Sequence, residues 1–215
     1  MNSKKKRSAV IFDCDGVMFD SRQANINFYN HILAHFDLPP MTEDSIAFVH
    51  MNTADESIRC LFRKTPLLKD AQEFIRQVDY TPFIGDMIIE PGLKELLKKL
   101  RPRFGLAVAT NRSNTIGKVL ECNGLDRVFD IVVSSLDVKN PKPHPESIFK
   151  ILDYFGIKPP ESIYVGDSMV DYETARAAGV IFISYKNREL EADYYTDSMS
   201  DIADIVGDNL QGAPV

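Results

Sequence analysis

Short runs of apolar residues recur along the chain, and the segments between them have helical periodicity. The runs are rich in Val and Ile, show no alternation of polar and apolar positions, and occupy residues 10–12, 106–109, 131–133, 163–165 and 180–183. Continuous apolar runs of this length are typical of strands that are covered on both faces of a parallel sheet. Strands that alternate with helices in this way predict an α/β fold with a doubly wound parallel sheet.

Three segments between these strands are predicted to be helices. Residues 92–100 place their leucines on one helical face and their lysines on the opposite face. Residues 115–122 and 148–155 are also amphipathic, and the second of these follows a proline and stops at Gly156, as helices commonly do. The tail after about residue 207 is expected to be frayed.

One interval between strands is much longer than the others. About 90 residues separate the first strand from the second, which begins near residue 104, whereas a crossover between parallel strands needs about a dozen. Helical patterns fill this interval, at residues 21–36, 42–49, 54–62 and 67–78. We therefore expect a core domain of residues 1–19 and 89–215 and an inserted helical cap of residues 20–88. An insertion after the first strand emerges at the edge where open α/β sheets bind ligands, so the cap would cover that site.

Polar residues stand where the predicted strands end. The carboxyl ends of neighbouring parallel strands meet at one edge of a sheet, so residues far apart in sequence come together there. The residues placed at this edge are Asp13, Asp15 and Gly16 after the first strand, Thr110 and Asn111 after the second, Lys142 in a proline-rich loop, and Asp167 and Asp171 after the fourth. Asp13 and Asp15 alternate around Cys14, which puts both acids on the same side of an extended chain. Gly16 then allows the backbone to turn tightly toward the insertion.

The acids at this edge indicate a metal site and phosphoryl chemistry. Carboxylates this close together repel, and they are stable near neutral pH only with a bound cation or with shifted pKa values. Oxygen ligands without a set of His and Cys residues favour Mg²⁺, which would in turn bind phosphate oxygens. The Lys142 ammonium and the Thr110 hydroxyl could contact the same phosphoryl group. An Asp placed here can act as a nucleophile that forms an aspartyl-phosphate, while a second carboxyl moves the proton.

Composition narrows the range of partners and compartments. The formal net charge is −6, so the overall field disfavours nucleic acid and anionic membrane surfaces. The basic run at residues 4–7 has no interleaved aromatic residues and is interpreted as a solvated arm. The cysteines, at positions 14, 60 and 122, lack metal-ligand spacing and favour free thiols. The first apolar run is too short for a signal peptide, and no segment approaches the ~18 apolar residues of a membrane span. We therefore expect a soluble cytoplasmic protein.

Four motifs, "DCDGV", "VATN", "KPHP" and "VGDSMVD", resemble in order and spacing those of the haloacid dehalogenase-like hydrolases. The similarity extends from about residue 10 to residue 206. It is greatest to the small-molecule phosphatases with a helical cap after the first motif, such as phosphoglycolate phosphatase, and "ARAAGV" after the fourth motif also resembles that branch. The resemblance implies a Rossmann-like core and Mg²⁺-dependent hydrolysis of a small phosphorylated metabolite. The expected oligomeric state is a monomer or a homodimer.

The resemblance also implies roles for the residues that follow the strands. Asp13 would be the nucleophile and Asp15 the general acid and base. Thr110 would hydrogen-bond the transferring phosphoryl group together with the backbone of Asn111. Lys142 would neutralise phosphate charge and orient Asp13.

The same resemblance implies a set of metal ligands. The side chains of Asp13 and Asp167 and the main-chain carbonyl of Asp15 would hold Mg²⁺. Asp171 would either support the metal through water or hold Lys142.

For the phosphate-binding lysine and for the substrate contacts, the sequence offers more than one candidate residue. Lys139 is an alternative to Lys142, although Lys142 matches the Lys-Pro pattern, and His144 is interpreted as structural or exposed. In the cap, residues 49–53 contain no glycine where capped relatives often carry one, so the resemblance does not transfer a substrate. His50, Asn52 and Arg59 are within possible reach of the site, but each is also explained as a surface or helix-cap residue.

Other activities remain alternatives at this stage. A mutase of the β-phosphoglucomutase type would use the same nucleophile but transfer the phosphoryl group to a second hydroxyl. A dehalogenase would lack an acid at the position of Asp15, and a phosphonatase would need a cap lysine, for which Lys64 and Lys69 are the candidates. A non-catalytic protein that binds a phosphorylated metabolite is the alternative from a different class, and the intact motif set argues against it.

Overall fold

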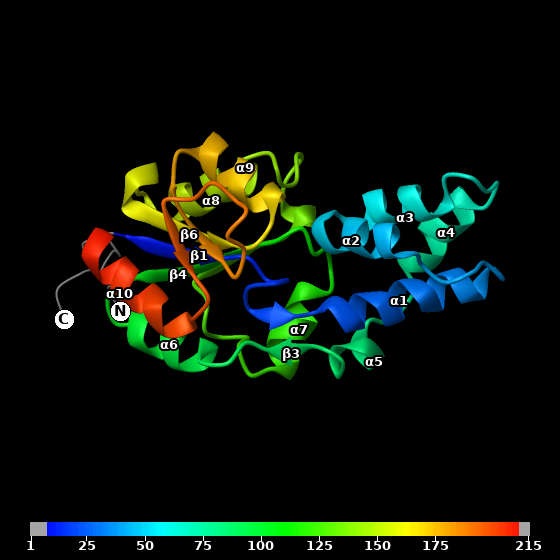
Figure 1. Cartoon of the computed structure of the whole chain (residues 1–215), viewed down its shortest axis with the longest axis horizontal. Coiled ribbons are helices and arrows are strands. Elements are labelled where there is room, and N and C mark those ends of the chain that lie inside the picture. The colour runs from blue at the N-terminus through cyan, green and yellow to red at the C-terminus, as the bar shows by residue number, and fades with distance from the viewer. Residues whose placement is uncertain (1–7, 211–215) are drawn as a thin grey trace.

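Six strands form a parallel sheet in the computed structural model, which describes residues 8–210 (Figure 1). The strand order is β5-β4-β1-β6-β7-β8, and each neighbouring pair is parallel. The strands are β1 (Ala9–Phe12), β4 (Gly105–Ala109), β5 (Ile131–Val133), β6 (Ser162–Gly166), β7 (Ile181–Tyr185) and β8 (Tyr194–Thr196). Because β1 lies between β4 and β6, the residues that follow it stand at the middle of the C-terminal edge of the sheet.

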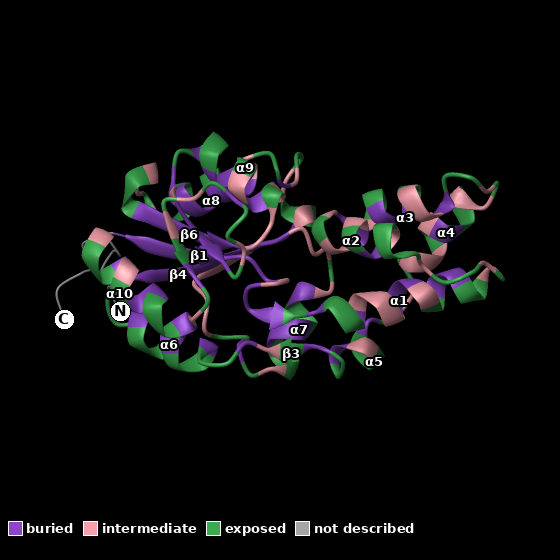
Figure 2. Ribbon diagram, viewed as in Figure 1, coloured by how far each residue is buried: buried purple, intermediate pink, exposed green. Residues whose placement is uncertain are grey.

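Helices cover both faces of this sheet, and the strands between them are buried (Figure 2). Ala9 and Ile11 of β1 belong to a core cluster with residues of α8 (Glu146–Phe155) and α9 (Met169–Ala178). Val10 and Phe12 belong to the cluster on the other face, with residues of α6 (Leu93–Leu100), α7 (Ile116–Cys122) and α10 (Met199–Asn209). Short 3-10 helices occupy Ser135–Asp137 and Pro159–Glu161. The predicted α/β fold with a doubly wound parallel sheet is therefore confirmed.

Five helices lie within residues 20–88, after the first strand of the large sheet. They are α1 (Arg22–His35), α2 (Glu43–Met51), α3 (Ala54–Phe62), α4 (Leu68–Ile75) and α5 (Thr81–Ile84), and they project beyond one end of the sheet (Figure 1). Aromatic residues pack within this group, with the Phe28 ring in edge contact with Tyr80 and Phe83. We retain the predicted core of residues 1–19 and 89–215 and cap of residues 20–88 as a proposal, which the position of these helices supports.

The chain enters and leaves this helical segment through a second, two-stranded sheet. In it β2 (Phe19–Asp20) pairs antiparallel with β3 (Ile88–Ile89). Directly after β3, the Glu90 N–H donates to the Met18 carbonyl at 3.0 Å. The buried Glu90 carboxylate accepts hydrogen bonds from Lys186 Nζ at 2.8 Å and from the Tyr185 hydroxyl at 3.1 Å. The return crossing is thus attached to the end of β7.

The structure differs from the sequence predictions in a few elements. The strand β8, the β2–β3 pair and the short helix α5 were not predicted, because each is only two to four residues long and β8 presents Tyr195 to solvent. The tail was expected to fray after about residue 207; α10 continues to Asn209, and the last five residues of that tail lie outside the described residues. The basic run at residues 4–7 lies outside the described residues. Among residues 8–210 no helix is both long and apolar enough to cross a membrane.

Candidate active site

Asp13 follows β1 at the C-terminal edge of the sheet and is buried. Its N–H donates to the Val165 carbonyl at 2.9 Å, which continues the β1–β6 ladder and fixes the backbone. Its Oδ1 atom accepts hydrogen bonds from the Cys14 N–H at 2.7 Å and forms an ion pair with Lys142 Nζ at 2.9 Å. The described residues supply no hydrogen bond to Oδ2, so this oxygen is available to a ligand.

Lys142 lies at the centre of a buried network. Its Nζ lies 2.9 Å from Asp13 Oδ1, 2.6 Å from Asp171 Oδ1 and 2.9 Å from the Tyr164 hydroxyl. An ammonium group has three N–H donors, so all of them are used. Lys139 is exposed and its backbone N–H is bonded to Glu146. The structure therefore places Lys142, and not Lys139, beside Asp13.

Asp171 orients Lys142. It lies in the first turn of α9, where its backbone N–H donates to the hydroxyl oxygen of the N-cap residue Ser168, and its side chain is fully buried. Its carboxylate accepts from Lys142 Nζ at 2.6 Å, the Tyr164 hydroxyl at 2.5 Å and the Ser168 hydroxyl at 2.6 Å. Burial opposes the charge, but the Lys142 ammonium and these hydrogen bonds lower the pKa of Asp171. Of its two expected roles, the geometry favours holding Lys142.

The turn after β4 connects this network to the phosphate-binding candidates. The Asn111 amide and the Lys142 backbone exchange two hydrogen bonds, each 3.1 Å long, which join the Lys142 loop to the end of β4. Thr110 is buried, and its Oγ1 accepts the Arg112 N–H at 3.1 Å. No group among residues 8–210 accepts its hydroxyl proton, which is available to a ligand. The Asn111 side chain is committed to positioning Lys142, which leaves its backbone for a phosphoryl group.

A pocket of oxygen ligands lies beside Asp13. Carboxylate oxygens of Asp13, Asp167 and Asp171 lie within 4.8 Å of one another. Gly16 has a φ of +78°, and a Cβ atom there would stand 2.1 Å from Asp167 Oδ2, so only glycine permits this close approach. Because the protein donors already surround the Asp171 oxygens, Asp13 and Asp167 are the acids with oxygens to offer.

The charge balance of this pocket is suited to a cation. Burial and the neighbouring charge of Asp171 raise the pKa of Asp13 to about 7, against the lowering effect of Lys142. Burial and the charge of Asp171 also raise the pKa of Asp167 well above its usual range. A bound divalent cation would remove both penalties. Hard oxygen donors without nitrogen or sulfur match Mg²⁺.

Asp15 forms a separate ion pair that the sequence did not predict. Arg112 contacts both oxygens of this carboxylate, through Nε at 2.8 and 3.0 Å and through Nη2 at 2.6 Å. The Ser21 hydroxyl also donates to Asp15. Burial opposes ionisation, but the Arg112 charge and hydrogen bonds outweigh it and lower the pKa of Asp15. The available signal was the position of Arg112, directly after Thr110 and Asn111 in a loop already assigned to the site.

Two residues of the helical segment, Tyr80 and Asn25, contact the Arg112 guanidinium. The Tyr80 ring lies under the guanidinium, with 4.9 Å from the ring centroid to the guanidinium carbon, and its hydroxyl is 3.1 Å from Nη2. Asn25 Oδ1 of α1 lies 3.4 Å from the same nitrogen and accepts the Tyr80 hydroxyl at 3.0 Å. Arg112 therefore connects the turn after β4 to the proposed cap.

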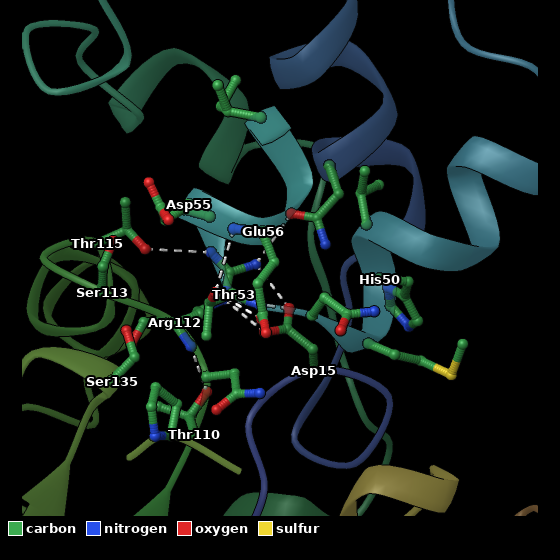
Figure 3. Close-up of a pocket in the computed structure, with 18 of the residues that line it drawn as sticks. Asp15, His50, Thr53, Asp55, Glu56, Thr110, Arg112, Ser113, Thr115 and Ser135 are labelled. Atoms are coloured by element: carbon green, nitrogen blue, oxygen red, sulfur yellow. Dashed lines mark hydrogen bonds and ion pairs between the residues drawn. The ribbon is translucent and has the colours of Figure 1, made fainter. Parts of the chain in front are cut away.

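These groups line a cavity of about 710 Å³ between the sheet edge and the helical segment. Figure 3 shows Arg112 directed toward Asp15, with Thr53, Asp55 and Glu56 on the cap side. His50 and Asn52, from the proposed cap, also line the cavity, and His50 Nδ1 is buried without a hydrogen-bond partner among residues 8–210.

The remaining cap candidates lie away from this cavity. Arg59 is not part of the lining and instead pairs with Asp55 at 2.6 Å. Lys64 and Lys69 are exposed and do not line the cavity, which disfavours a phosphonatase. His144 is exposed, and its Nδ1 accepts the Glu146 N–H at 3.2 Å.

Comparisons with known proteins agree with this architecture. The family model described as "Haloacid dehalogenase-like hydrolase" matches residues 10–185. A pyrophosphatase PpaX of Halalkalibacterium halodurans is 29% identical over 213 residues, covering 93% of this chain and 97% of that protein. A crystal structure of a haloacid dehalogenase-superfamily hydrolase of subfamily IA from Geobacter sulfurreducens is 40% identical, with a TM-score of 0.82 and coverage of 93% of this chain and 99% of that chain.

A further structure extends the similarity in fold alone. A predicted phosphoglycolate phosphatase from Haemophilus somnus has a TM-score of 0.81 at 24% identity, covering 93% of this chain and 98% of that chain. The protein belongs to the haloacid dehalogenase-like hydrolases. It is an enzyme of the phosphatase class within them.

Proposed function

We propose that the enzyme is a Mg²⁺-dependent phosphatase that transfers the phosphoryl group of a small metabolite to Asp13. The observation that carries this proposal is the position of Asp13, whose Oδ2 atom has no hydrogen-bond partner among the described residues and lies beside the Lys142 ammonium. The Thr110 hydroxyl and the Asn111 backbone stand at the neighbouring strand end, where they can hydrogen-bond a phosphoryl group.

The proposed reaction has two steps. The Asp13 carboxylate attacks phosphorus, the bond from phosphorus to the leaving oxygen breaks, and an aspartyl-phosphate forms. Water then attacks the phosphorus of this intermediate, Asp15 accepts the water proton, and inorganic phosphate is released from Asp13. The ionised state in which Arg112 holds Asp15 suits the second step. The first step needs either a proton on this carboxyl or a leaving group that departs as an anion.

The proposed metal ligands are the carboxylates of Asp13 and Asp167 and the main-chain carbonyl of Asp15. Support comes from the short distances between the acids and from the raised pKa values of Asp13 and Asp167. When bound, Mg²⁺ would offset the negative charge that the nucleophile and the phosphoryl group bring together. Lys142, which Asp171 holds in place, would offset the remaining negative charge of Asp13 and the phosphoryl group.

The proposed substrate is a small phosphorylated metabolite, as for a phosphoglycolate phosphatase-like enzyme. A cavity of about 710 Å³ is of a size that encloses a small metabolite. The 29% identical relatives are named as pyrophosphatases, so an inorganic phosphoanhydride belongs to the same candidate set. We further propose a cytoplasmic protein that acts as a monomer or a homodimer.

Substitution of the nucleophile tests this proposal. Asp13→Asn should lower the rate of phosphate release from p-nitrophenyl phosphate with Mg²⁺ by at least ~10³-fold, because an amide cannot form the acyl-phosphate. The matched control is Asp153→Asn, an exposed acid on α8, which should leave the rate unchanged. Equal activity of Asp13→Asn and the wild type would rule out Asp13 as the nucleophile.

A product analysis separates a phosphatase from a mutase. A phosphatase releases one inorganic phosphate for each substrate consumed and needs no bisphosphorylated intermediate. Retention of the phosphoryl group on an isomeric sugar phosphate would instead establish phosphoryl transfer between hydroxyls.

A further inference from the structure

We propose that Arg112 determines specificity by binding a second anionic group on the leaving portion of the substrate. This inference rests on the proposed function and assigns a substrate class to the same site: phosphate esters or anhydrides with a carboxylate or a second phosphoryl group close to the bond that breaks. Arg112 exchanges its present partner, the Asp15 carboxylate, for that anion.

The position of Arg112 follows from the turn after β4. Its backbone N–H donates to Thr110 Oγ1 at 3.1 Å. This hydrogen bond fixes the backbone of Arg112 next to the proposed phosphoryl site. Its guanidinium reaches Asp15, two residues after the nucleophile. When the phosphoryl group of a substrate lies at Asp13, the leaving group of that substrate would therefore lie close to the guanidinium.

The guanidinium has donors to spare. Nε and Nη2 contact Asp15, while the sole hydrogen bond of Nη1 within residues 8–210 is to Thr115 Oγ1 at 3.4 Å. A guanidinium has five N–H donors and binds carboxylate and phosphate groups through the same fork geometry. An incoming anion can thus engage Nη1 and then take over the contacts that Asp15 makes.

The guanidinium would stay in place during such an exchange. The Tyr80 ring supports one face at 4.9 Å, and the Tyr80 hydroxyl and Asn25 contact Nη2. The Arg112 side chain is only 7% exposed and keeps its charge at every relevant pH, so it needs an anion at all times. Asp15 meets this need here, and the oxygens of a substrate carboxylate or phosphoryl group can accept from the same guanidinium donors.

The other charged groups around the cavity are less suited to this role. Lys142 has all three donors committed, and Arg76 is exposed. The cap acids do not neutralise Arg112, because Asp55 pairs with Arg59 and Glu56 accepts from Thr53. Among the described residues that line the cavity, Arg112 is the buried cation with unused donors.

The test compares 2-phosphoglycolate with its carboxamide, which differ in this second charge, and adds inorganic pyrophosphate as a second anionic ligand. The anionic probes are 2-phosphoglycolate and inorganic pyrophosphate, and the neutral probe is the carboxamide of 2-phosphoglycolate. The wild type should prefer an anionic probe in kcat/KM by about 100-fold, since a site built for a polar group discriminates strongly against its absence. Arg112→Met should reduce this preference below about 10-fold, and Arg112→Lys should give an intermediate value. The control is Arg103→Met, which removes an exposed arginine away from the cavity and should keep the full preference.

The same comparison can be made by binding. Calorimetry with the Asp13→Asn protein and Mg²⁺ gives Kd values for the three probes without turnover, and the anionic probes should bind at least 30-fold tighter than the carboxamide (about 2 kcal/mol). Absence of phosphate release by the wild type would contradict the proposed function, whereas this binding preference would still support the role of Arg112.

Two results would overturn the inference. One is a wild type that binds and turns over the carboxamide as well as either anion, which needs no variant to fold. The other is an equal loss for all three probes in both Arg112 variants, because a residue that only positions Asp15 would affect every substrate alike.

Discussion

Two buried cations, Lys142 and Arg112, line the same cavity, and the molecule holds them in different ways. Lys142 contacts Asp13, Asp171 and Tyr164, all of which follow or belong to strands and helices of the sheet region. Arg112 contacts Asp15 from the same region but also Asn25 and Tyr80 near the helical segment. One cation is thus enclosed by a single part of the molecule, while the other lies between two parts.

This difference separates two kinds of task. A cation with every donor committed to buried groups stays where it is, so Lys142 suits a charge that must be present in each step. A cation whose partners come from two regions changes its surroundings whenever those regions move, so Arg112 suits a group that responds to the substrate. The predictions below test whether the two centres are distinct.

The largest effect is expected when the enclosed cation is removed. Lys142→Met leaves Asp13 and Asp171 as unpaired buried acids, so we expect the fold to lose about 3–5 kcal/mol. We also expect kcat to fall by about 10²–10³-fold, because the charge on the transferring phosphoryl group loses its partner. Urea denaturation and steady-state assays measure the two effects. Lys139→Met, three positions earlier and exposed, is the control, and an equal loss in that variant would contradict the assignment.

Much of the Lys142 centre could be predicted from sequence. Continuous apolar runs marked the strands, and the acids, hydroxyl and lysine at their ends had to meet at one edge of a parallel sheet. Tyr164 could not be predicted, because within the strand it resembles any other buried aromatic residue. Only its distances to Lys142 and Asp171, both under 3 Å, reveal its contribution.

A smaller effect is expected from metal binding to the acids beside Lys142. The pKa of Asp13 is raised to about 7 from 3.8, so the folded protein holds a proton that the unfolded chain releases between about pH 4 and 7. The contribution of this group to the free energy of unfolding therefore falls as pH rises through that range. Mg²⁺ competes with this proton, so excess Mg²⁺ should raise Tm by about 5 °C at pH 8 and by much less at pH 5.

Thermal denaturation with and without Mg²⁺ at both pH values makes this measurement. In Asp13→Asn the difference between the two pH values should shrink, because that position no longer titrates. A Tm shift of the same size at pH 5 and pH 8 in the wild type would show that protons and Mg²⁺ do not compete.

The smallest changes in the free energy of unfolding are expected from the two tyrosines whose rings lie next to the cations. The Tyr164 hydroxyl contacts Lys142, Asp171 and the Ala109 carbonyl in the core, so Tyr164→Phe should cost about 1–3 kcal/mol. The Tyr80 hydroxyl contacts Arg112 and Asn25 between the two regions, so Tyr80→Phe should cost about 1 kcal/mol or less and keep the ring under the guanidinium. Urea denaturation compares both variants, and equal losses would mean that the two centres are equally rigid.

The position of Arg112 beside Thr110 and Asn111 was visible in the sequence, but its pairing with Asp15 could not be predicted, for a physical reason. Asp15 and Arg112 are 97 positions apart, and nothing in their local patterns links them. Tyr80 and Asn25 belong to the helical segment, whose placement against the sheet depends on packing rather than on the strand pattern. The sequence therefore located the acids and their lysine but not the pairing of Arg112 with Asp15.

The pairing of β2 with β3 means that the helical segment starts and finishes at one place on the molecule. Paired strands lie about 4.8 Å apart, so the chain leaves the sheet region and returns to it at nearly the same point. None of the six strands of the large sheet is interrupted between these crossings. Insertions at such points are tolerated because the surrounding backbone keeps its path. Exchange of the helical segment at these two crossings would therefore change the lining of the cavity while Asp13, Lys142 and Asp171 keep their places.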